Sequence, residues 1–254
     1  IEFAAAIEIF NADRKDLDKK ITEEALIQII DNEEGNRFSS VVFQEDWHKG
    51  VIGIVASRLI EKYYRPTLVF TKSGDKLAAS ARSVKGFDVY NALLECEEFI
   101  EQFGGHKYAA GLTLAPENYE NFKNKFEEVV EKTIDKKLLT PEIAIDAEIE
   151  LSEITPKFFR IIQQMAPFGP MNMKPTFTST CVRDNGYGKK VGKEQTHLKL
   201  NVFQGDNKKT YNAIGFNLGD KMEFVQDDFD IAYSVDENEW NGFKSIQLLL
   251  KDLK

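Results

Sequence analysis

The sequence predicts an α/β domain preceded by a helix and followed by a small all-β barrel. Apolar positions at helical spacing open the chain, and helical and β-prone segments then alternate up to about residue 138. Beyond that point, short β-prone runs separated by Gly, Asn and Asp turns dominate. We therefore expect three regions, residues 1–34, 35–138 and 139–254.

Composition narrows the functional classes. A formal charge of −9 and a pI near 5.1 argue against coating nucleic acid through global charge, although a local basic groove is compatible with them. Cys96 and Cys181 form no metal-binding or disulfide pattern, which favours a reducing cytoplasmic setting. The sequence has no membrane-length apolar run. It has no initiator Met and begins with an apolar face already running, so we expect a piece of a longer chain.

The first thirty residues predict one or two helices. A signal at Thr22-Glu23-Glu24 favours a break near residues 20–22. Asn11 and Arg14 lie three residues apart and share a helical face, where a solvated pair and a functional pair are equally compatible with the spacing.

Within the α/β region, a helix begins near Val51 and ends at Arg65-Pro66, since the residue before proline disfavours helix. Gly104-Gly105 is expected to punctuate the end of a later helix. The other predicted elements are strands at 38–43, 67–70, 77–81 and 108–114 and helices at 89–100 and 119–134.

The last region carries a different pattern. Residues 143–151 alternate apolar and acidic side chains, as in a half-buried strand, and Thr155-Pro156 begins a helix that runs through Met165. About five strands with a single helix are typical of an OB-type barrel. The five runs are 176–182, 197–203, 210–216, 229–235 and 242–250.

Two segments suit an anionic ligand. In Ser80-Ala81-Arg82-Ser83, hydroxyls surround a guanidinium whose planar fork of donors fits a phosphate, although an ordinary loop with a surface arginine would also read this way. In Gly104-Gly105-His106, paired glycines permit close backbone approach and place an imidazole at its edge; a glycine helix cap is the alternative. The sequence has no Asp and His cluster suited to two divalent ions.

Further candidates are weaker. Trp47 more plausibly packs in the core than binds a ligand, whereas His48, Lys49 and Arg58 stay undecided between solvent and a cleft. In the last region, a basic and aromatic stretch resembles the grooves with which OB folds hold single strands, while a solvated hairpin tip is the alternative. That stretch contains Tyr187, Lys189, Lys190, Lys193, His197 and Lys199.

The ordered combination of motifs resembles the RecJ family of bacterial single-stranded-DNA-specific exonucleases. Each motif is weak alone, but their order spans nearly the whole chain. They are Asn11-x-x-Arg14, Trp47-His48-x-Gly50-Val51-Ile52-Gly53-Ile54-Val55-Ala56-Ser57-Arg58-Leu59, Tyr64-Arg65-Pro66, Ser80-x-Arg82-Ser83, Phe103-Gly104-Gly105-His106, Ala109-Ala110-Gly111 and Pro167-Phe168-Gly169-x-x-Asn172-x-x-Pro175.

The resemblance implies a connecting helix, a DHH-associated domain and an OB domain, in that order. It also implies a preceding DHH domain that holds two Mn²⁺ or Mg²⁺ ions and hydrolyses phosphodiesters 5′ to 3′ in DNA repair and recombination. The present chain would bind substrate without a metal of its own and would not cleave DNA alone. Implied partners are single-stranded DNA, single-strand-binding protein and a helicase, with no membrane.

Site roles follow from the same resemblance. Ser80 and Arg82, with Ser83 and Arg14, would hold the phosphate at or next to the 5′ end. Gly104, Gly105 and His106 would face the scissile bond, with His106 as the catalytic residue in this chain. Three alternatives stay open: a DHH-family phosphodiesterase for short oligonucleotides or cyclic dinucleotides, a non-catalytic nucleic-acid-binding module, and a module of alanyl-tRNA synthetase-like proteins.

Overall fold

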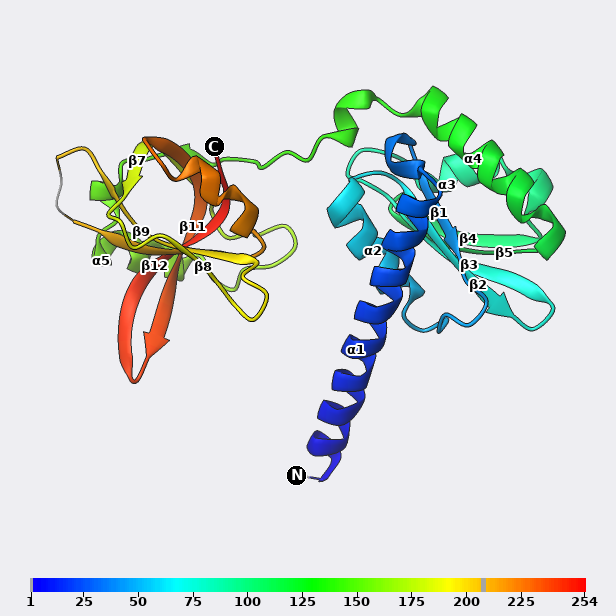
Figure 1. Cartoon of the computed structure of the whole chain (residues 1–254), viewed down its shortest axis with the longest axis horizontal. Coiled ribbons are helices and arrows are strands. Elements are labelled where there is room, and N and C mark those ends of the chain that lie inside the picture. The colour runs from blue at the N-terminus through cyan, green and yellow to red at the C-terminus, as the bar shows by residue number, and fades with distance from the viewer. Residues whose placement is uncertain (1, 207–208) are drawn as a thin grey trace. The chain divides into compact units, whose positions relative to one another are not determined.

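The computed structural model describes residues 2–206 and 209–254, and the chain divides into two compact units, residues 1–141 and 142–254 (Figure 1). The predicted succession of a helix, an α/β domain and a β-rich OB-like domain is confirmed. No helix among the described residues is both long enough and apolar enough to cross a membrane.

The first unit begins with one continuous helix, α1 (Glu2–Asp31). The predicted break near residues 20–22 is wrong, because the Thr22 hydroxyl donates to the carbonyl oxygen of Asp18 (2.7 Å) inside the helix instead of capping a new one. Ile21, Ala25 and Ile29 are buried, so the second half of α1 anchors it to the unit. The apolar side chains of its first turns, Phe3, Ile7, Ile9 and Phe10, are exposed.

A five-stranded sheet forms the middle layer of this unit, in the order β1-β2-β3-β5-β4. β1 and β2 are parallel, and the remaining neighbours are antiparallel. The strands are β1 (Ser40–Phe43), β2 (Thr67–Ser73), β3 (Lys76–Arg82), β4 (Gln102–His106) and β5 (Ala109–Leu114).

Helices cover the sheet on both faces. α2 (Ile52–Tyr63) and the second half of α1 share a core with Val42 and Val69 on one face. α3 (Val89–Leu94) and α4 (Tyr119–Thr133) cover the other, where Val41, Leu68 and Phe70 are buried. α2 packs mainly on β2 and β3, and the edge strand β4 is largely exposed.

The glycine pair lies in a different element from the one predicted. The expected helix over 89–100 ends at Leu94 and continues as a short 3-10 turn at Glu97–Phe99. Gly104 and Gly105 then lie inside the edge strand β4, so they do not cap a helix. The pairing of β4 with β5 decided this, and a local glycine signal does not encode such a partner.

The second unit is a seven-stranded sheet in the order β6-β7-β11-β12-β10-β9-β8, and β7 also pairs with β9. This extra pairing brings the sheet back on itself around an apolar core that includes Val182, Leu200, Val202 and Tyr233. The strands are β6 (Ala147–Glu148), β7 (Phe177–Asp184), β8 (Lys189–Val191), β9 (His197–Gln204), β10 (Tyr211–Gly215), β11 (Phe229–Trp240) and β12 (Phe243–Leu253).

One prediction in this unit differs from the structure, and one strand was not predicted. The alternating run at 143–151 pairs as a strand only at Ala147–Glu148, and Ile143 and Ile145 are exposed, because an alternating pattern defines a face without supplying a partner strand. β8 was not predicted. The helix α5 (Pro156–Gln164) is confirmed, with the Thr155 hydroxyl accepting from the Phe158 amide (3.1 Å) at its start.

Candidate nucleic-acid interface

One open sheet face collects most of the residues predicted to bind phosphate. The register of β3, β5 and β4 places Ser80, Gly111 and Gly104 in one row across the three strands. Two positions along the strands, Arg82 on β3 and His106 on β4 both pair with the same residue of β5, which lies between them. Paired residues point to the same side of a sheet, and side chains alternate along each strand. Ser80, Arg82 and His106 therefore share a face with two glycines between them.

The first turn of α2 lies against Ser80 and Arg82. A Cβ at Gly53 would lie 2.8 Å from Arg82 Nη2 and 3.0 Å from Ser80 Oγ, so a larger residue would displace both. Arg82 Nη1 donates to Ser80 Oγ (3.0 Å) and to the carbonyl oxygen of Ala81 (2.8 Å). These contacts hold a half-buried guanidinium beside the positive end of the α2 dipole, an arrangement that attracts an anion.

His106 presents one defined edge. Its Nδ1 accepts from the Tyr108 amide (3.2 Å), so the neutral ring carries its proton on Nε2 and can donate to a phosphate oxygen. Gly105 beside it has φ +154°, and a Cβ there would lie 2.3 Å from the carbonyl oxygen of Ala109. Only glycine fits at this position, which keeps the turn that places His106.

Ser83 lies outside this face, since β3 ends at Arg82. Its hydroxyl donates to the carbonyl oxygen of Phe87 (3.0 Å), and its amide donates to the carbonyl oxygen of Tyr108 (3.1 Å). Ser83 therefore fastens the loop after β3 to the turn between β4 and β5. It supports the neighbouring arginine and histidine through the backbone.

A hollow of about 310 Å³ follows the two glycines on the sheet. Gly104 has no atom within 4 Å of its Cβ position, so the strands are bare there. Lys49 borders this hollow and donates from Nζ to Ser73 Oγ (3.2 Å), which adds a cation that the motif analysis left undecided. Its other lining residues are Ala78, Ala79, Gln102, Phe103, Gly111, Leu112 and Thr113.

Arg14 belongs to a second cluster, with Arg58. Arg14 donates from Nε and Nη2 to Asn11 Oδ1 (3.3 and 3.0 Å) and from Nη1 to Asp18 Oδ2 (3.1 Å). Arg58 Nη2 lies 2.7 Å from Asp18 Oδ1 as an ion pair without hydrogen-bond geometry. Sequence reasoning missed Asp18, although its spacing of four residues from Arg14 on one helix was a usable signal.

Trp47 and His48 have local structural roles. Trp47 is buried and donates from Nε1 to Glu24 Oε2 (2.8 Å), which confirms its packing role. His48 Nδ1 accepts from the Gly50 amide (3.0 Å) and shapes the turn that leads into α2. This contact binds one ring nitrogen of His48 to the backbone.

Two buried groups of this unit with shifted pKa values lie outside the interface. Burial lowers the pKa of Arg65, whose guanidinium donates to Ser40 Oγ (2.7 Å) and to backbone carbonyl oxygens that include those of Glu34 and Arg37. Burial also raises the pKa of the Cys96 thiol to about 12, which keeps it protonated and inert. Both residues serve the fold.

In the second unit, part of the basic and aromatic stretch forms a groove of about 330 Å³. Lys189 on β8 is directly opposite Lys199 on β9, and Tyr187 is exposed at the same hollow. Asn201 Nδ2 donates to Asn212 Oδ1 (3.0 Å) on its floor. An aromatic face beside two ammonium groups suits a base and its phosphate.

The remaining predicted lysines of this stretch lie elsewhere. Lys190 pairs with the core residue Leu198, so its side chain leaves the opposite face of β8 from Lys189. Lys193 is exposed in the turn between β8 and β9. The stretch therefore splits into groove residues and residues outside the groove.

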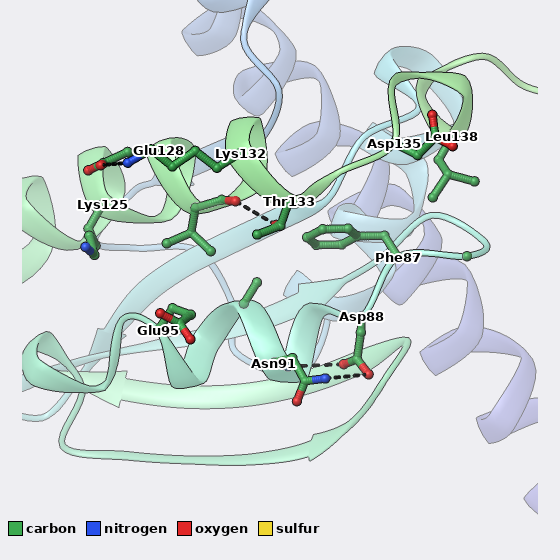
Figure 2. A pocket seen from close by; sticks show the side chains of 13 residues that line it. Phe87, Asp88, Asn91, Glu95, Lys125, Glu128, Lys132, Thr133, Asp135 and Leu138 are labelled. Carbon is green, nitrogen blue, oxygen red and sulfur yellow. Dashed lines mark hydrogen bonds and ion pairs between the residues drawn. The ribbon is translucent and has the colours of Figure 1, made fainter.

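A hollow of about 700 Å³ contains no predicted site residue (Figure 2). It lies between α3 and α4, on the sheet face opposite Arg82, and its polar groups largely serve the fold. The Asp88 carboxylate accepts from the Asn91 amide (3.1 Å) at the start of α3, and Thr133 Oγ1 donates to the carbonyl oxygen of Val129 (2.6 Å). Volume alone does not identify the interface.

Within residues 2–206 and 209–254, no group of three or more His, Cys, Asp or Glu side chains is placed to hold a metal ion. These residues therefore offer a divalent ion no ligand set of their own. The chemistry of the described interface is that of cations, hydroxyls, amides and an imidazole directed at an anion.

Comparison with known families matches both units. The DHHA1 domain model matches residues 34–132, and the RecJ OB domain model matches residues 145–252. The chain therefore combines a DHHA1 domain with a RecJ-type OB domain. It is 31% identical to the single-stranded-DNA-specific exonuclease RecJ of Bacillus subtilis over 256 residues, which cover 99% of this chain and 32% of that protein. The RecJ of Salmonella typhimurium is 28% identical, covering 98% of this chain and 44% of that protein.

A solved structure of RecJ has the same fold. A crystal structure of RecJ from Thermus thermophilus in complex with Mn²⁺ superposes with a TM-score of 0.79 at 24% identity, covering 98% of this chain and 35% of that chain. The chain thus spans about a third to under half of the length of these RecJ relatives.

Proposed function

We propose that this chain is the substrate-binding part of a RecJ-type 5′-to-3′ single-stranded-DNA exonuclease that acts in cytoplasmic DNA repair and recombination. The observation that supports this most is the convergence of Ser80, Arg82 and His106 on one open sheet face beside Gly104 and Gly111. Three donors of different kinds then surround a place where bare backbone permits close approach.

In the proposed role, Arg82 and Ser80 bind the 5′-terminal phosphate, and this grip sets the direction of digestion. The Nε2–H of His106, in the same row as Arg82, donates to the oxygen of a neighbouring phosphate and orients the scissile group. The groove with Tyr187, Lys189 and Lys199 holds nucleotides farther along the strand. A divalent ion in a DHH domain outside this chain would activate the attacking water. We expect this chain alone to bind strands without cutting them.

The test is a binding titration with oligothymidylates that carry a 5′-phosphate or a 5′-hydroxyl, labelled at the 3′ end and followed by fluorescence anisotropy. We expect the unchanged chain to prefer the 5′-phosphate strand. Arg82→Ala should weaken the binding of the 5′-phosphate strand about tenfold and that of the 5′-hydroxyl strand much less, because a charge-assisted contact to the terminal phosphate is lost.

Lys76→Ala is the matched control. Lys76 lies on the same strand and face as Arg82, six residues away, or roughly 20 Å at strand spacing. It should leave the preference for the 5′-phosphate unchanged. Equal losses at both strand ends in Arg82→Ala would refute the end-phosphate role. Tight cyclic-dinucleotide binding without strand binding would support the small-substrate phosphodiesterase instead.

A further inference from the structure

A buried carboxylate lies between two exposed arginines on the α1 and α2 side of the first unit. The Asp18 side chain is 0% exposed, whereas those of Arg14 and Arg58 are 39% and 44% exposed. Arg14 comes from the preceding turn of α1 and Arg58 from α2, so one carboxylate joins the two helices. A buried charge is costly unless it is paired, which explains at least one of these arginines.

The second arginine exceeds what the fold requires. One carboxylate and two guanidiniums leave a net charge of +1, and both arginine side chains are partly exposed to solvent. Hydrogen bonds to the described residues use three of the five N–H donors of Arg14. Asn11 accepts two of these bonds and fixes the plane of the guanidinium. Two pre-oriented guanidiniums with donors to spare fit the oxygens of a phosphodiester.

This cluster is separate from Ser80 and Arg82. Gly53 touches those two residues, and Arg58 lies five residues farther along α2, about 140° around the helix at 3.6 residues per turn. The two cationic positions therefore flank an exposed ridge of α2 that carries Ser57. A helix is roughly 10 Å wide, so the two positions are far enough apart to contact different phosphates of one strand.

We propose that Asp18 is a positioning residue that builds a second anion site from Arg14 and Arg58, and that this site binds an internal phosphodiester of the strand. The inference rests on the proposed function, since its ligand is the strand whose end Arg82 holds. Asp18 touches no substrate and acts by aiming the two guanidiniums.

The direction in which Asp18→Asn changes the affinity for the strand tests this proposal. The change raises the net charge by one and therefore strengthens strand binding if charge alone matters. If Asp18 positions the arginines, the substitution weakens binding by about fivefold, equally for 5′-phosphate and 5′-hydroxyl strands. The log–log slope of affinity against salt should also fall by about 0.7, the value of one lost phosphate contact on a single strand.

Asp16→Asn is the matched control, because Asp16 is exposed on the same helix and the change in net charge is identical. It should bind at least as tightly as the unchanged chain. In an Arg14→Ala, Arg58→Ala background, adding Asp18→Asn should cause no further loss of binding, because the guanidiniums that Asp18 positions are absent; a further loss would refute the positioning role. If Asp18→Asn fails to fold, Arg58→Ala carries the test, because Arg14 still pairs with Asp18 there; we expect about a threefold loss at both strand ends.

The outcomes separate the two proposals. If the unchanged chain prefers 5′-phosphate strands and Asp18→Asn behaves like Asp16→Asn, the second site is refuted and the proposed function stands. A loss in Arg58→Ala confined to 5′-phosphate strands would also refute it, since the cluster would then serve the terminal phosphate. If the unchanged chain shows no salt-sensitive strand binding, both proposals are refuted.

Discussion

The two cationic regions of this protein hold their charges in different ways. In the first unit, neighbouring residues brace the guanidiniums. Arg82 donates a hydrogen bond to Ser80 and lies close to Gly53, and Arg14 donates a hydrogen bond to Asp18. In the second unit, Lys189 and Lys199 are exposed on neighbouring strands. A braced planar fork selects a geometry, whereas a flexible ammonium supplies attraction with little selectivity. The contrast suggests that the first unit recognises a particular phosphate and the second unit retains the strand.

The largest expected effect is a loss of folding stability, and it comes from a substitution in the backbone of the first unit. Gly105→Ala is expected to lower the free energy of unfolding by about 2–4 kcal/mol, because its Cβ would meet the carbonyl oxygen of Ala109 at 2.3 Å. Gly186→Ala, beside the groove of the second unit, has φ +90° but no atom within 4 Å, so about 1 kcal/mol is expected.

Urea unfolding measures both losses, with Gly104→Ala as the neighbouring control. Gly104 has open space at its Cβ position and should tolerate the change. Similar losses for Gly105→Ala and Gly186→Ala would mean that the first unit is no more tightly constrained than the second.

An exchange of cation types should produce an intermediate effect. Arg82→Lys keeps the charge but removes the fork that Ser80 and Ala81 hold, so the preference for 5′-phosphate strands should fall about fivefold. Lys189→Arg should leave strand affinity within about twofold, because only a point charge is required there. Anisotropy titrations with both strand ends measure the two changes. A preserved preference in Arg82→Lys would contradict the braced-fork view.

The smallest effect separates two adjacent lysines. Lys189→Ala should reduce the salt slope of single-strand binding by about 0.7, the value expected for one phosphate contact. Lys190→Ala removes the same charge from the other face of β8 and should leave the slope unchanged. Titrations across a salt series decide between them, and an equal slope change in both variants would indicate general attraction without a defined groove.

Local signals in the chain predicted much of the fold. The helix expected over 119–134 is α4 (Tyr119–Thr133), and the run at 197–203 is β9 (His197–Gln204), because helical spacing, alternation and turn residues act over a few neighbours. The phosphate role of Ser80, Arg82 and the glycine pair stays a prediction from local chemistry, because hydroxyl, guanidinium and bare backbone are properties of the residues themselves.

Only the tertiary structure decided which of these residues meet. The row of Ser80, Gly111 and Gly104 depends on strand register, and the bracing of Arg58 by Asp18 joins two helices about forty residues apart. The same limit explains the strand at 143–151 that pairs over two residues only. Pairing and burial are set by partners distant in the chain, whereas a local pattern encodes a face and leaves its partner unspecified.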